Sequence, residues 1–375
     1  MAGALGLTRT EAGLLMTANL TGYLLFSLLG GSLASRYGTR KVMTYSLILI
    51  GITLILTGLS TNYYHLLFLR FLTGFGNGGV YIPAMALGAL WFSSKQRGLV
   101  TGIAGAGPGA GIFFTGIIIP PILYSRGWNE SWFAMGLLVL AIYVLCFFLL
   151  RDHPQEKTQI KQKDDSASDD SAPDDSTPKG WRTVYRHPGI RNLGLVYIMY
   201  GFAYAGYATF FHAFLNTEMG LAEHQSAAMW SLAGGLSLFS AMMWGRISDK
   251  LGRKYALSLV YLVNAVSYAL FFFCDTLSGY YFSAILFGLG LGSIPTIVAA
   301  SAADQVGPKL ASTAMGFLTA FFSIGQLIGP ALGGYLADYT DSYRIVFAAS
   351  AFIAVVGATG SLLLKKPSQP PLESG

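Results

Sequence analysis

Eleven long apolar stretches constrain this chain more than any other feature of its sequence. Each is close to the roughly 20 apolar residues that an α-helix needs to cross the core of a bilayer. The stretches lie at residues 12–34, 42–59, 66–92, 98–123, 132–150, 192–216, 225–248, 256–274, 279–303, 311–337 and 344–364. The sequence therefore predicts an all-α membrane protein with eleven transmembrane helices in this chain.

The composition argues against a soluble enzyme. Charged residues make up 11% of the 375 residues and hydrophobic residues 53%, whereas a soluble domain carries about 25% charged residues. Cys146 and Cys274 lie inside apolar stretches, so we interpret them as packing residues and not as a disulfide or metal pair. The histidines stand singly, so we expect no enzyme, no metal and no cofactor: His65, His153, His187, His212 and His224.

The basic residues predict the orientation of the helices. All 24 lie in loops on one side of the predicted membrane except Arg9, Arg126 and Arg344, which lie on the other side, and Arg70, which lies within a span. Because positive loops stay in the cytoplasm, we expect a cell-membrane protein with its C-terminus inside and its N-terminus outside. Scattered basic clusters of this kind fit membrane loops better than a nucleic-acid surface.

Residues 151–191 divide five predicted spans from six. They contain DDSAS, DDSAP and DDSTP in tandem from Asp164 to Pro178, an acidic repeat with nothing apolar to bury. We interpret this segment as a cytoplasmic linker, with a regulatory or partner-binding segment as the alternative. The predicted domains are an N-terminal helical bundle at 1–150, the linker, a C-terminal bundle at 192–364 and a cytoplasmic tail at 365–375.

Two loops in the two halves resemble each other. The first reads GSLASRYGTRK from Gly31 to Lys41, and the second reads GRISDKLGRK from Gly245 to Lys254, an offset of 214 residues. The same offset relates Gly74 and Gly76 to Gly288 and Gly290. A repeat on this scale is the mark of a transporter built from two related bundles.

The loop pattern GxxxD(R/K)xG(R/K)(R/K) resembles the signature of the major facilitator superfamily. The second copy matches fully, whereas the first has Ser35 in place of Asp, which puts its charge network in doubt. The run from Arg70 to Gly74 resembles a second pattern of the family, and GPKLASTAMGFLTAFFSIGQLIGPALGG resembles the YbfB/YjiJ-type bacterial permeases. The resemblance implies two pseudo-symmetric six-helix bundles. The repeat then predicts that the first of twelve helices is missing before residue 1, through a late start codon or a real truncation.

The resemblance gives the loop motif a gating role. We expect its charged residues to latch the cytoplasmic side during alternating access and its first glycines to let helices approach closely. The alternative is that these cations only set topology. The motif residues are Gly31, Arg36, Gly38, Arg40, Lys41, Gly245, Asp249, Lys250, Gly252, Arg253 and Lys254.

Arg70 is the one ionised residue well inside a predicted span. A cation in the bilayer interior is costly and faces a cavity or a partner. We expect Arg70 to take part in proton coupling, as the matching arginine does in the family, or to bind an anionic substrate. The alternative is a structural residue that reaches the outer interface.

Tyr197, Tyr200, Tyr204 and Tyr207 recur at helical spacing and share one face of their helix. We expect this stripe to line a substrate cavity, with plain aromatic packing as the alternative, and His212 on the same helix to gate or titrate. Further candidates for substrate contact are Asn19, Trp230, Asn264 and Gln326.

The leading hypothesis is a monomeric secondary transporter that moves a small organic anion or neutral metabolite and is coupled to protons. No GxxxxGK(S/T) motif for ATP is present. Gly325 to Gly334 resembles the antiporter motif of drug exporters, but the helix with Pro108 matches it incompletely at Ile103 and Ile112. Drug or metabolite efflux is therefore the first alternative, and a membrane sensor that keeps the permease fold is the second.

Overall fold

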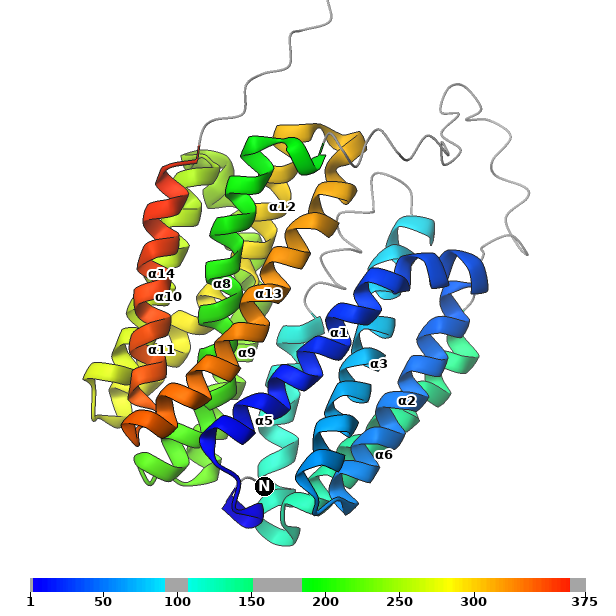
Figure 1. The fold of residues 1–375 in the computed structure, drawn as a ribbon, viewed down its shortest axis with the longest axis vertical. Helices are drawn as coiled ribbons and strands as arrows, with labels where there is room; N and C mark the ends of the chain where they lie inside the picture. Colours follow the sequence, from blue (N-terminus) through cyan, green and yellow to red (C-terminus); the bar gives the residue numbers. More distant parts are fainter. Residues whose placement is uncertain (1–2, 92–106, 151–183, 365–375) are drawn as a thin grey trace, which may run out of the picture. The chain divides into compact units, whose positions relative to one another are not determined.

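The computed structural model describes residues 3–91, 107–150 and 184–364. In these ranges the regular structure is helical throughout, so the predicted fold class is confirmed (Figure 1). A short turn, η1 (Gly3–Leu5), precedes the long helices. They are α1 (Arg9–Tyr37), α2 (Thr39–Leu59), α3 (Tyr63–Trp91), α5 (Gly107–Arg126), α6 (Trp128–Leu149), α8 (Pro188–Ala213), α9 (Glu223–Leu251), α10 (Arg253–Phe273), α11 (Leu277–Gly290), α12 (Ser293–Val306), α13 (Pro308–Thr340) and α14 (Arg344–Leu362).

Each predicted span coincides with helix in the part of the chain that the structure describes. Counting only described residues, nine helical segments are long and apolar enough to cross a membrane. Because α1 and α3 are not among the nine, the number of eleven stays a prediction. Large apolar side chains cover outward faces, as on α6, where Leu145, Phe148 and Leu149 are 60%, 73% and 77% exposed. An apolar surface of this kind is suited to lipid and not to water.

The internal repeat is visible in the helix boundaries. Helices α1 and α9 are both 29 residues long, α2 and α10 are both 21, and the second member of each pair begins 214 residues after the first. Gly38 and Gly252, which precede α2 and α10, have φ of 88° and 89°. Only glycine adopts such angles without strain, which explains the second glycine of the loop pattern.

The predicted span at 279–303 lies within one membrane-crossing segment, Leu277–Val306, but its helix is interrupted near the middle. Leu291 is extended and Gly292 is left-handed, with φ of 80°, so α11 ends at Gly290 and α12 begins at Ser293. The carbonyl oxygen of Leu289 is satisfied by Ser240 and by the Trp244 indole, at 2.7 and 2.8 Å. These side chains replace the backbone hydrogen bonds that the break removes.

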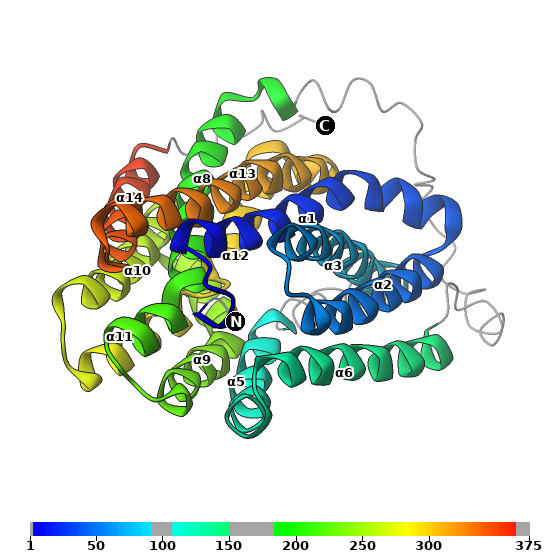
Figure 2. The ribbon, with the colours of Figure 1, turned by 60° about the horizontal axis from the view of Figure 1, so that its bottom comes forward.

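The chain forms two compact units. The first comprises Ala18–Gly107 and Ser125–Thr177, in which α2 packs between α3 and α6 (Figure 2). The second comprises Ala2–Thr17, Pro108–Tyr124 and Pro178–Gly375, in which α8 packs on α13 and α14, and α10 on α11 and α14. The division at 151–191 that the sequence predicts stays a prediction, since the compact units place the first turns of α1 and most of α5 with the C-terminal helices.

Candidate transport site

Arg70 lies on α3 inside the first unit, among hydroxyl groups and an indole ring. Its guanidinium donates to Thr57 Oγ1 at 2.8 Å and to Thr73 Oγ1 at 3.3 Å. It also stands over the ring of Trp132 on α6, 4.4 Å from the ring centre. These contacts orient the cation, and the aromatic face stabilises its charge.

Arg70 has no counter-charge among the residues that the structure describes. No carboxylate of the described residues lies within ion-pair distance, and the buried Nε has no hydrogen-bond partner there. A buried charge normally has a paired counter-ion. The site can therefore accept a negative charge or an additional acceptor.

The close approach of α1 to α3 explains why a glycine, Gly74, lies four residues after Arg70. A Cβ atom at Gly74 would clash with the backbone carbonyl of Asn19 on α1. The Asn19 side chain in turn donates to the carbonyl oxygen of Arg70 at 3.0 Å. The predicted candidate Asn19 thus serves to join α1 to the helix that carries Arg70.

The second loop motif forms a charge cluster at one end of the second unit. Arg253 donates to Asp249 at 2.5 Å, to Ser248 at 3.0 Å and to Asp304 at 2.8 Å. Arg253 thereby ties α9, α10 and α12 together. Asp304 was not predicted, because it lies 51 residues from Arg253 in the sequence and only the fold brings it close.

The other motif residues have different surroundings. Arg40 donates to the carbonyl oxygen of Phe147 at 2.5 Å, and Lys254 lies over the ring of Tyr255. Lys41 and Lys250 are exposed. A Cβ at Gly245 would meet nothing within 4 Å, so the expected close helix approach at Gly245 is wrong. The surroundings of Gly31 and Arg36 lie outside the described residues.

The tyrosine stripe forms an aromatic stack inside the second unit. Tyr197 and Tyr200 are parallel to within 3°, and Phe322 of α13 stacks on both, at 4.8 and 5.5 Å between ring centres. Both tyrosines are 3% exposed, and Tyr204 is half-buried and stacks on Phe287 of α11. The stripe therefore packs α8 against α11 and α13.

Tyr207 does not reach a cavity. It is fully buried and its hydroxyl is hydrogen-bonded to Ser283 at 2.9 Å, so the expectation that Tyr207 lines a substrate cavity is corrected. Asn264 and Gln326 are also buried, at 2% and 8% exposure. Asn264 lies against Gly290, at the break between α11 and α12.

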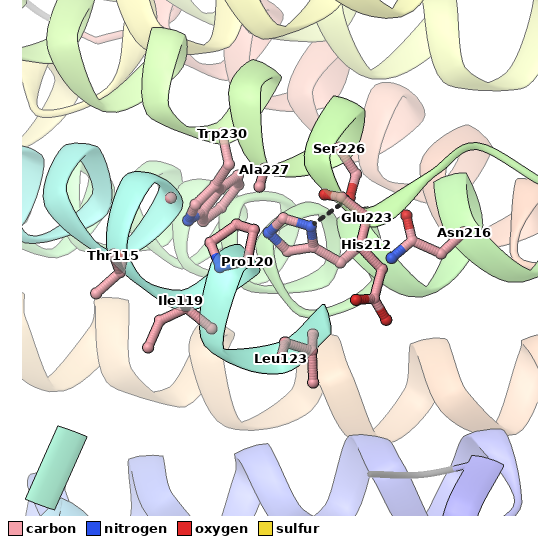
Figure 3. Close-up of a pocket in the computed structure, with 11 residues that line it drawn as sticks. Thr115, Ile119, Pro120, Leu123, His212, Asn216, Glu223, Ser226, Ala227 and Trp230 are labelled. Carbon is pink, nitrogen blue, oxygen red and sulfur yellow. Dashed lines mark hydrogen bonds between the residues drawn. The ribbon is translucent and has the colours of Figure 1, made fainter. Parts of the chain in front are cut away.

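A pocket of about 220 Å³ lies between α5, α8 and α9, and it brings together the predicted candidates His212 and Trp230 (Figure 3). Their rings are 5.6 Å apart. His212 Nδ1 is hydrogen-bonded to Ser226 Oγ at 3.1 Å. The remaining lining residues are Thr115, Gly116, Ile119, Pro120, Leu123, Asn216, Glu223, Ser226 and Ala227.

Asn216 and Glu223 were not predicted as site residues. The chain enters a π-helical turn at Phe214–Glu218 directly after α8, and this turn carries Asn216 into the pocket. Such turns often occur at functional sites, but the sequence holds no reliable signal for them. Among the described residues no group of three His, Cys, Asp or Glu side chains is placed to hold a metal.

Known proteins similar to this chain are transporters. The pattern of the Major Facilitator Superfamily matches residues 1–280 and 193–375. The "Probable sulfoacetate transporter SauU" of Cupriavidus necator is 25% identical, over 96% of this chain and 86% of that protein. The "Hexuronate transporter" of Bacillus subtilis is 23% identical, over 97% and 87%.

A solved nucleoside transporter, NupG, shares the fold with a TM-score of 0.77 at 15% identity, over 98% of this chain and 93% of that one. Its identity is too low to show more than the fold. The match to the family pattern, the similar transporters, the helical fold and the repeat agree with one another. The chain belongs to the Major Facilitator Superfamily and is a multi-pass membrane transporter of a small solute, not an enzyme.

Proposed function

We propose that this protein carries a small organic anion across the cell membrane by proton-coupled alternating access. The observation that carries the proposal is Arg70, a half-buried guanidinium that the described residues leave without a carboxylate partner. A carboxylate or sulfonate on the substrate would supply the missing charge and an acceptor for the orphan Nε.

The relatives support an anion over a neutral solute. Sulfoacetate and hexuronates, the substrates in the names of two similar proteins, both carry carboxylate groups, and sulfoacetate also carries a sulfonate. These names describe those proteins. They agree with the electrostatics around Arg70, which would make an organic cation the least suitable substrate for this chain.

The test is solute counterflow in proteoliposomes. Four solutes are tested in turn: sulfoacetate, a hexuronate, a nucleoside and an organic amine. For each one, vesicles are loaded with the unlabelled solute, and uptake of the same labelled solute from outside is measured. We expect exchange of the anions, competition only between anions, and none with the amine. Exchange of the nucleoside alone would contradict the anion proposal, and no exchange of any solute would favour a non-transporting sensor.

Arg70→Gln should weaken anion exchange. Hydrogen bonds to a charged group contribute about 1.5–3 kcal/mol, so the apparent affinity for the anion should fall about 10- to 150-fold. Arg70→Lys keeps the charge but loses the fork of donors, and we expect an intermediate loss. Arg126→Gln removes an exposed arginine as the matched control. Unchanged exchange by Arg70→Gln would assign Arg70 a structural role.

A further inference from the structure

The hydroxyl groups beside Arg70 are held with their lone pairs toward it. The Thr57 hydroxyl has one hydrogen, which it donates to the carbonyl oxygen of Thr53 at 2.7 Å. The Thr73 hydroxyl donates its own hydrogen to Thr53 Oγ1 at 2.9 Å or to the carbonyl oxygen of Leu69 at 2.7 Å. Both hydroxyls are therefore ready to accept from Arg70 Nη2, at 2.8 Å for Thr57 and 3.3 Å for Thr73.

These hydroxyl groups lie inside the contact between α2 and α3. Thr57 is fully buried, and Thr53 and Thr73 are 2% and 4% exposed. Because α2 packs directly on α3, a ligand can take the place of these hydroxyls only by separating the two helices. Nη2 is therefore bound to the protein and is not offered to a substrate.

The other two nitrogens of the Arg70 guanidinium have no hydrogen-bond partner among the described residues. Of the two, Nε is buried and Nη1 is not. The guanidinium also stands over the Trp132 ring, 4.4 Å from its centre, which restricts the directions from which a ligand can approach. Nη1 is therefore the terminal nitrogen that remains open to a ligand.

We infer that Thr57 is a positioning residue of the anion site. Its hydroxyl holds Nη2 of Arg70 against α2, and this contact orients the guanidinium with Nη1 open before the substrate arrives. Without the contact the long arginine side chain would sample other rotamers, and binding of the substrate would have to order it again. Thr57 has the shorter of the two hydroxyl contacts and makes it from a different helix. The inference rests on the proposed function, because it requires Arg70 to bind the anion.

Thr57→Val tests this contact, because valine has the shape of threonine and lacks its hydroxyl. Nη2 then loses its nearer acceptor. We expect the apparent affinity for the anion in counterflow to fall about 10-fold, while the maximal rate of exchange is retained. Thr57→Ser keeps the hydroxyl and should restore the wild-type affinity. Thr44→Val is the matched control, since Thr44 is a buried threonine of the same helix whose hydroxyl donates to backbone carbonyl oxygens.

A double variant separates positioning from packing. Arg70→Leu leaves no donor for the Thr57 hydroxyl. If Thr57 acts through Arg70, adding Thr57→Val to Arg70→Leu should not lower the remaining affinity any further. A packing defect at Thr57 would instead lower the affinity by the same factor whether or not the guanidinium is present.

The outcomes distinguish the inference from the proposed function. The inference is overturned, and the function stands, if Arg70→Leu weakens anion exchange while Thr57→Val binds the anion like the wild type. Equal losses from Thr57→Val with and without Arg70, or a loss that Thr57→Ser does not restore, would also overturn it. Unchanged anion exchange by Arg70→Leu, or no anion exchange by the wild type, would refute the proposed function, and the role of Thr57 with it.

Discussion

Single residues far apart in the sequence complete each other's hydrogen bonds in this protein. The first N–H groups of a helix have no partner within the helix. In α1 the N–H groups of Arg9 and Thr10 donate to the carboxylate of Asp338 on α13, at 3.0 and 2.8 Å, and the Thr10 hydroxyl donates to it at 2.5 Å. Asp338 therefore acts as an N-cap supplied by another helix, and its charge suits the positive end of α1.

Removal of this cap should destabilise the protein. Loss of an N-cap costs about 0.5–2 kcal/mol, so we expect Asp338→Ala to lower the thermal midpoint of the purified protein, and Asp338→Asn to lower it less. Asp341→Asn is the control, since the Asp341 side chain that pairs with Arg9 is 94% exposed, and exposed pairs contribute little. Equal midpoints for Asp338→Ala and Asp341→Asn would show that the cap is unimportant.

The sequence alone indicates those candidate residues that are ionisable and lie within apolar stretches. Arg70 and His212 are of this kind and can be recognised without a structure. Asp304, Asn216 and Asp338 could not be recognised, because nothing near them in the chain indicates Arg253, His212 or Arg9. Asp304 and Asp338 lie 51 and 329 residues from the arginines that they contact, and Asn216 enters the pocket of His212 only through a π-helical turn.

At the scale of helices, α5 and α9 pack through small residues. A Cβ at Gly116 would clash with Ser231 Oγ and lie 2.8 Å from the Ala227 carbonyl oxygen, and one at Gly109 would clash with Ser237 Oγ. Ser231 donates to the carbonyl oxygen of Phe113 at 3.1 Å. In a membrane, where lipid is as apolar as any side chain, close backbone contact of this kind holds helices together.

Gly116→Ala should loosen this contact. Overpacking costs about 1–3 kcal/mol, and the displaced α5 would also widen the pocket at His212, so we expect lower thermal stability and slower transport. Gly111→Ala lies on the same helix with nothing within 4 Å of the added Cβ and should behave as the wild type. If both variants lose transport equally, the effect comes from helix flexibility and not from α9.

The charge cluster at the end of α9 predicts how substitutions of its two aspartates change the transport rate. Because Arg253 joins Asp249 to Asp304, we expect Asp249→Asn and Asp304→Asn each to change the transport rate while expression is retained. The double variant should change it little further, since both act through one cation. Additive effects would contradict a shared latch.

At the scale of the whole molecule, the distribution of basic residues predicts topology. A fluorescent protein fused to the C-terminus should be fluorescent in bacterial cells, and alkaline phosphatase fused there should be inactive, because the C-terminus is expected in the cytoplasm. A fusion after Asp341 should give the reverse. Active phosphatase at the C-terminus would show that every loop lies on the side of the membrane opposite to the one predicted.

The architecture was largely predictable because hydropathy and an offset of 214 residues are both readable in one dimension. The same signals could not reveal the break at Gly292, because a continuous apolar stretch predicts a continuous helix. The break depends on Ser240 and Trp244, which are distant in the sequence and donate to the carbonyl oxygen of Leu289. They also could not divide the helices between compact units, which depends on packing among distant segments.

Gly38 and Gly252 adopt the same backbone torsion in two loops of different charge, with φ of 88° and 89° after Ser35 and Asp249. The shape of each turn is therefore independent of the acidic residue of the loop pattern. The glycine sets the geometry of the turn, and the charge beside it is free to differ between the two halves of the repeat.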